Sequence, residues 1–164
     1  MKKLFSYSFD LTPPKPKRHE YAYNEFRISL PLHWRQYPTP EERTLHFQSD
    51  TAQAALTISV SFYEVPDDKA QRIAEKMLDA RLEAFQSGVQ GKVEVLRRTI
   101  APHSSGAGLE ISFVGEAEGE SVYLYLGFVT ARKILNFALV CRPGREEAAD
   151  LFNEIMRDFH PLLP

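Results

Sequence analysis

Histidine and cysteine are the side chains of this chain best suited to bind a metal or to act as a nucleophile and its base. They stand at His19, His33, His46, His103, His160 and Cys141. A metal site requires such residues at short, defined spacings, for example two histidines four residues apart or a histidine near a pair of cysteines. These residues lack that spacing, so we expect no metal site, no cofactor and no catalytic residue.

Two other patterns that resemble chemical motifs have sufficient structural explanations. The glycine-rich segment His103–Gly108 is predicted to lead into a strand, whereas a phosphate-binding loop leads into the N-terminus of a helix. Acidic pairs such as Asp67-Asp68 and Glu146-Glu147 fall at predicted helix starts, where carboxylates complement exposed N–H groups. We therefore expect a protein that is not an enzyme.

The charge of the chain is weakly asymmetric. Residues 1–20 contain five Lys or Arg and two acids, a net charge of +3, which leaves −5 for the rest of a chain whose total is −2. Nucleic-acid binding needs a basic surface on the folded part, so we expect no nucleic-acid partner. The basic segment is rich in proline and predicts an extended linker. We interpret residues 1–22 as an N-terminal extension and linker, and residues 23–164 as one domain.

The first residues do not have the pattern of an export signal. Lys2 and Lys3 precede a segment that alternates polar and apolar residues, and Asp10 comes before an apolar run of about seven residues forms. We expect no stable membrane insertion and, with a single cysteine and no intrachain disulfide, a cytoplasmic protein. The alternation is either an extra edge strand or a frayed terminus, and its apolar members are Phe5, Tyr7, Phe9 and Leu11.

Residues 109–141 alternate large apolar residues with small or polar ones, the period of two that is typical of strands. A two-residue turn at Glu118-Gly119 and a second turn centred on Arg132 and Lys133 would place the large side chains of three strands on one face. In this register Phe128 lies opposite both Leu109 and Phe137, and a slip of one residue would turn every side chain to the other face. The predicted core face holds Leu109, Ile111, Phe113, Leu124, Leu126, Phe128, Phe137, Leu139 and Cys141.

The opposite face of this predicted sheet would carry small residues and tyrosines, and residues 55–65 repeat the alternation. Small residues allow a helix to approach closely, and tyrosine provides apolar area with a polar tip. We expect this tyrosine face to bind a partner through Ser59, Ser61, Tyr63, Tyr123, Tyr125, Gly127 and Ala138.

Two further segments have the 3.6-residue period of amphipathic helices. One runs from Asp67 to Gly88 and the other from about Arg145 to His160, where Pro161 stops it. The predicted fold is α+β, with a single antiparallel sheet of about five to six strands and two amphipathic helices packed on it. We expect both helices on the core face, which leaves the tyrosine face open. The alternative is one helix on each face.

The order of these elements resembles the PsbP/DcrB-like superfamily. The likeness rests on a short strand ending in LPLHW, the strand pair TLHFQS and ALTISVSFYEV, a long helix, a meander of about four strands and a closing helix. We expect Trp34, the last residue of LPLHW, to fill one end of the core. Members of that superfamily are mostly non-catalytic. The chain is most similar in character to its Eag-type chaperones of type VI secretion, which are cytoplasmic and hold hydrophobic helices of an effector on an open sheet face.

Three functions follow as hypotheses. The first is a non-catalytic cytoplasmic adaptor or chaperone that binds a hydrophobic helical segment of a partner protein, such as a secretion effector, on the open sheet face. A homodimer is compatible with this hypothesis. The second is an immunity or accessory protein that binds a folded partner through loops or an edge strand, with rim residues such as Arg132 and Lys133 in contact. The third is a carrier of a small ligand.

Overall fold

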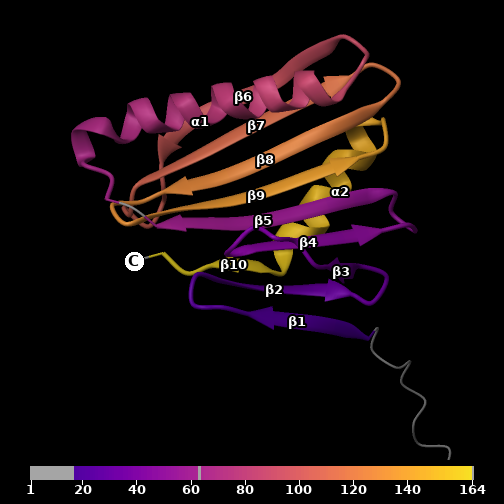
Figure 1. Cartoon of the computed structure of the whole chain (residues 1–164), viewed down its shortest axis with the longest axis horizontal. Coiled ribbons are helices and arrows are strands. Elements are labelled where there is room, and N and C mark those ends of the chain that lie inside the picture. Colours follow the sequence, from indigo (N-terminus) through magenta and orange to yellow (C-terminus); the bar gives the residue numbers. More distant parts are fainter. Residues whose placement is uncertain (1–16, 63, 164) are drawn as a thin grey trace, which may run out of the picture.

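The computed structural model describes residues 17–62 and 64–163, which form two antiparallel sheets and two helices (Figure 1). The smaller sheet has the order β1 (Arg18–Ala22), β2 (Phe26–Pro31), β10 (Phe159–Pro161). The larger sheet has the order β3 (Arg35–Tyr37), β4 (Thr44–Ser49), β5 (Ala54–Phe62), β9 (Lys133–Cys141), β8 (Ser121–Val129), β7 (Leu109–Ala117), β6 (Val93–Pro102). The helices are α1 (Asp67–Gly88) and α2 (Arg145–Arg157).

The prediction of a single sheet of five to six strands was wrong, because the chain forms one sheet of seven strands and one of three. Two segments that were not expected to be strands account for the small sheet. The segment that was interpreted as the end of a linker forms β1, which pairs with β2, so the folded part begins before residue 23. After α2 ends at Arg157, Phe159–Pro161 turn into β10 and complete the small sheet, where the sequence predicted a helix up to His160.

The register between β7 and β8 differs from the prediction by one residue, and this changes which side chains share a face. Three residues, Glu118 to Glu120, separate the paired Ala117 and Ser121, and Gly119 adopts a positive φ of 73° between them. Ile111 therefore lies opposite Gly127, and Phe113 opposite Tyr125. Since side chains alternate along a strand, the apolar residues of β7 face the same side as the tyrosines of β8.

The turn between β8 and β9 also differs from the prediction. It is closed at Thr130 and Lys133, whose backbones are joined by a hydrogen bond, so that the pairing moves by two residues and Leu126 lies opposite Phe137. A shift of two keeps each side chain on its face. The predicted core face of β8 and β9 is therefore retained, while that of β7 is inverted.

The two helices pack on opposite faces of the large sheet, so the expectation that both cover the same face was wrong. In Figure 1, α1 crosses in front of β6 and β7, and α2 lies behind the sheet; α1 also contacts β8. On the front face, Leu78 and Phe85 of α1 pack with Phe113, Tyr123 and Tyr125. The core is consequently divided into two clusters that the sheet separates.

The rear core cluster joins α2, the small sheet and the back of the large sheet. It contains Ile155 of α2, Ile28 of β2, Phe137 of β9 and the fully enclosed Trp34, which follows β2. The burial of Trp34 agrees with its predicted place in the core. Burial of each large side chain of this kind contributes about 1.5 to 3 kcal/mol to folding.

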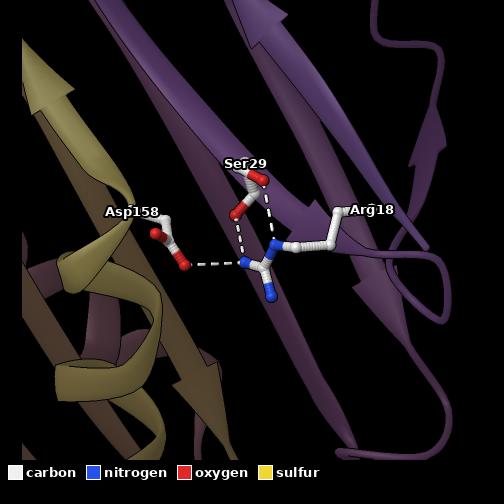
Figure 2. Close-up of polar contacts among 3 residues, drawn as sticks. All are labelled: Arg18, Ser29 and Asp158. Carbon is white, nitrogen blue, oxygen red and sulfur yellow. Dashed lines mark hydrogen bonds and ion pairs between the residues drawn. The ribbon is translucent and has the colours of Figure 1, made fainter. Parts of the chain in front are cut away.

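A polar contact ties the first strand to the end of α2 (Figure 2). The Arg18 guanidinium donates to the Asp158 carboxylate at 2.9 Å, to the Ser29 carbonyl oxygen at 2.7 Å and to the Ser29 hydroxyl oxygen at 2.9 Å. Asp158 also accepts a hydrogen bond from the Ser29 N–H at its carbonyl oxygen. These bonds hold β1, β2 and the C-terminus of α2 together.

Candidate functional site

Small side chains follow one another across the middle of the front face of the large sheet. Thr57 of β5 lies opposite Ala138 of β9, and Ala138 lies opposite Tyr125 of β8. In the neighbouring row Ser59 lies opposite Asn136, which lies opposite Gly127. Bulky residues thus occupy β7 and β8, where α1 packs, and small ones occupy β5 and β9. The sheet is wider than one helix, so the small-residue strip beside α1 stays uncovered.

The uncovered strip is a groove, which we call the front groove. It has a volume of about 470 Å³. Its floor and two walls come from β4, β5, β8, β9 and α1, and it is lined by His46, Ala55, Thr57, Ser59, Arg81, Ala84, Phe85, Gly88, Val89, Ser121, Tyr123, Asn136, Ala138 and Val140. The size and the mostly apolar lining, with a few polar groups that converge on it, are typical of a binding site.

A hydrogen-bonded chain of polar side chains lies at the floor of the front groove. The Tyr125 hydroxyl donates to the Asn136 side-chain oxygen, and the Asn136 amide donates to the Ser59 hydroxyl at 3.4 Å. At the β4 side, His46 Nδ1 and the Thr57 hydroxyl form a hydrogen bond of 3.1 Å. These bonds satisfy the polar groups of the floor and hold Asn136 in one orientation.

The α1 wall of the groove carries Arg81 and Phe85. The Arg81 guanidinium lies over the Tyr125 ring, 4.9 Å from its centroid, and Phe85 stacks on Tyr123 with ring centroids 5.4 Å apart. Burial raises the pKa of Tyr123, and the charge and hydrogen bonding of Arg81 act in the opposite direction. Both tyrosines therefore support the helix and its arginine.

The predicted tyrosine face is not open, because α1 covers most of it. Tyr125 is only 1% exposed and Gly127 is buried beneath it. Tyr123 is 8% exposed and contributes only an edge to the front groove. Their burial follows from the one-residue difference in the turn between β7 and β8, which brings the apolar side of β7 and hence α1 to this face.

The other predicted site residues are divided between the groove and its surroundings. Ser59 and Ala138 line the front groove as neighbours on its floor. Ser61 is exposed but lies outside the lining. Tyr63 lies outside the described residues, as does the alternating segment near the N-terminus. The structure therefore brings Ser59, Ala138 and Tyr123 together, whereas Ser61, Tyr125 and Gly127 do not line the groove.

Arg81, His46 and Asn136 are groove residues that sequence reasoning did not select. Arg81 had a usable signal, because it lies three residues after Leu78 and four before Phe85, within the apolar stripe of α1. A charged residue in the middle of such a stripe indicates a special environment. His46 and Asn136 had no such signal, since only the pairing of β4, β5 and β9 brings them to one place.

A second hollow lies on the opposite face of the sheet, beside α2, and has a volume of about 530 Å³. We call it the rear groove. Its rim carries Arg97 and Glu110, and Phe152 and Ala149 of α2 form one wall. Each helix thus covers about half of one sheet face and leaves a groove on the other half. The rear groove has a charged rim of both signs, and none of the described residues that line it has a buried side-chain nitrogen or oxygen without a hydrogen-bond partner.

The described residues also bear on metal binding and membrane insertion. Within the ranges 17–62 and 64–163, no group of three or more His, Cys, Asp or Glu side chains could hold a metal ion. Neither helix of that part of the chain is long and apolar enough to cross a bilayer.

A wide antiparallel sheet with one long helix and one closing helix defines a PsbP-like fold. The solution structure of cyanobacterial PsbP (CyanoP) from Synechocystis sp. PCC 6803 matches with a TM-score of 0.65 and 15% sequence identity, over 91% of this chain and 95% of that chain. This confirms the PsbP-like fold that the order of elements predicted, and at this identity the likeness shows the fold alone. No protein-family model matches the sequence, and no curated protein matches it either.

Proposed function

We propose that this protein is a non-catalytic adaptor or chaperone that binds a hydrophobic helical segment of a partner protein in the front groove. The observation that carries the proposal is the strip of Ala55, Thr57, Ser59 and Ala138 left uncovered beside α1. Small side chains let a helix approach the sheet closely, and Phe85 and Val140 provide apolar contact at the edges. The proposal moves the partner-binding surface from the tyrosines to this strip.

The surroundings of the groove support a protein segment as the occupant. The groove opens to solvent at its edge, where Val140 is 37% exposed. An apolar helix that filled the groove would complete the cover of the sheet that α1 begins. Exposed apolar area of this kind, next to ordered polar groups, is typical of an interaction surface.

The proposal also names the cellular compartment and the protein that carries the bound segment. We place the complex in the cytoplasm and propose a secretion effector of the type VI kind as the partner. What supports this is the element order shared with the PsbP/DcrB-like superfamily, to which Eag-type chaperones belong. A homodimer is compatible with the proposal, since β6 leaves one edge of the large sheet unpaired among the described strands.

The test is a pair of matched substitutions on opposite faces. Ala138→Phe fills the floor of the front groove, and Ala149→Phe makes the same change at an exposed position of the rear groove. We expect Ala138→Phe to lower recovery of the partner in an affinity pull-down at least about tenfold, and Ala149→Phe to leave it unchanged. Truncation of the apolar segment of the recovered protein should have the same effect as Ala138→Phe.

Three results would contradict this function. One is recovery of the partner by Ala138→Phe at the level of the unsubstituted protein, with thermal unfolding showing an intact fold. Another is loss of the partner on Arg132→Glu, a change at an exposed turn residue that the immunity or accessory function requires. The third is co-purification of a small molecule without any protein, which would support the ligand carrier.

A further inference from the structure

Arg81 is a positive charge without a negative partner in the front groove. It is the only permanently charged residue among the fourteen that line the groove, and no acidic residue lines it. The ion pairs of the described residues involve Arg18, Arg98 and Arg145, not Arg81. Arg81 Nε is the one buried side-chain nitrogen or oxygen of the described residues that has no hydrogen-bond partner.

The contacts of Arg81 hold its guanidinium in place but do not neutralise it. The Tyr125 ring beneath it supplies a cation–π interaction, and the Tyr123 side chain is hydrogen-bonded to it. A guanidinium has five N–H donors arranged to bind a carboxylate through two parallel hydrogen bonds. Tyr123 uses only part of this donor capacity, and neither tyrosine carries a negative charge, so the charge of Arg81 is not compensated in the groove that it lines.

A purely apolar segment would be a poor occupant for this groove. It would remove water from the half-buried Arg81 without supplying a counter-ion, and a buried charge that lacks a counter-ion is strongly unfavourable. A segment that places one carboxylate against Arg81 avoids this cost and forms a charge-assisted hydrogen bond in a desolvated site.

We propose that the hydrophobic segment bound in the front groove carries a single Asp or Glu whose carboxylate pairs with Arg81. This inference rests on the proposed function and specifies the chemistry of its partner. Arg81 then selects among apolar helices, because a helix without an acid leaves the guanidinium unpaired and a helix with a basic residue at that place is repelled.

The experiment uses two synthetic peptides that differ in one atom group. Both are helices of Leu and Ala, about 20 residues long with lysines at the ends for solubility. One has a Glu at its centre and the other a Gln. Binding to the full chain is measured by fluorescence anisotropy. We expect the Glu peptide to bind about tenfold more tightly than the Gln peptide.

Variants of Arg81 then assign the preference to this residue. In Arg81→Gln the preference for the Glu peptide should disappear, whereas Arg81→Lys should retain part of it because the charge remains and the paired geometry is lost. Arg132→Gln is the matched control, since it removes one arginine from an exposed turn. It should leave the preference unchanged, which separates a local pair from the effect of total charge.

The outcomes distinguish the two proposals. Equal binding of the Glu and Gln peptides overturns the carboxylate pairing and leaves the proposed function intact. A preference that survives in Arg81→Gln, with the fold shown intact by circular dichroism, also overturns it. Failure of both peptides to compete with a partner recovered through the front groove contradicts the proposed function and the inference together.

Discussion

Gly127 shows how one small residue determines the arrangement of the front groove. A Cβ atom at this position would lie 2.3 Å from the Tyr125 hydroxyl oxygen and 2.9 Å from Ile111 Cγ1. The absence of a side chain at Gly127 leaves the space in which the Tyr125 hydroxyl reaches the Asn136 side chain. Gly127 therefore contributes to the site as a support for Tyr125 and Arg81, although the sequence suggested it as a contact surface for a partner.

The first prediction concerns this position. Gly127→Ala should lower the free energy of unfolding by about 1 to 3 kcal/mol, because Tyr125 and Ile111 must move in a packed core. Denaturant unfolding measures the change. Gly88→Ala is the matched control, since a Cβ there meets nothing within 4 Å, and it should leave stability unchanged or slightly increased. Equal stability of the two variants would show that Tyr125 is not confined by Gly127.

Cys141 is the second residue whose environment leads to a prediction. Its thiol is buried in the rear core cluster beside the Val122 carbonyl oxygen, and burial raises its pKa from 9.0 to about 11. Below pH 9 the thiol is protonated in both the folded and the unfolded chain, so it has no effect on the pH dependence of stability. Between pH 9 and 11 only the unfolded chain ionises, which favours unfolding.

Unfolding free energies of the unsubstituted protein and Cys141→Ala should therefore converge as pH rises from 9 to 11. The thiol's contribution to this loss is about 2 kcal/mol at pH 11, and comparison with Cys141→Ala removes the contributions of lysines and tyrosines that titrate in the same range. Parallel curves for the two proteins would mean that the thiol ionises equally easily in both states.

At the scale of elements, the attachment of β1 depends on few interactions. This strand pairs with β2 on one side only, and four of its five residues are exposed. The Arg18 contacts with Ser29 and Asp158 add a link to α2 that the pairing alone does not provide (Figure 2). The small sheet is thus joined to α2 in two ways, through the Arg18 contacts of β1 and through β10, which follows the helix in the chain.

Arg18→Ala should release β1 without unfolding the rest. We expect hydrogen exchange in residues 18–22 to become about tenfold faster and global stability to fall by about 1 kcal/mol, since the ion pair is partly exposed. Arg27→Ala, at an exposed arginine of β2, is the control and should change neither. Unchanged exchange in β1 would show that strand pairing alone is sufficient.

At the scale of the whole molecule, the two helices divide the sheet between them. Each covers part of a different face, so the central strand β8 is enclosed on both sides, whereas β9 borders the front groove and β6 forms one edge of the sheet. Seven of the nine residues of β8 are buried and the other two are half-buried, whereas most of β6 is exposed. Stability is expected to follow this pattern.

Native-state hydrogen exchange should accordingly be slowest in β8 and β9 and fastest, within the large sheet, in β6. The reason is that opening β9 must break both core clusters, but β6 is bonded only to β7. Residue-resolved exchange at neutral pH measures this order. Protection of β6 equal to that of β9 in dilute solution would indicate that another chain pairs with the β6 edge.

The sequence by itself determined the two helices, the strands from 109 to 141 and the order of elements that indicates a PsbP-like fold. Those features depend on local periodicity, which a single segment displays on its own. The turn at Glu118 could not be settled in this way, because two and three turn residues are both compatible with a glycine of positive φ. That one residue decided on which face the apolar side of β7 lies.

Only the tertiary structure decided the site. The front groove exists because β5 and β9, which are distant in sequence, pair and place small side chains next to one another while α1 covers the neighbouring strands. The burial of Tyr125 and the unpaired Nε of Arg81 follow from the same packing. Periodicity specifies that a segment has two faces, but the helix that covers each face is chosen by long-range packing and strand register, which no local pattern encodes.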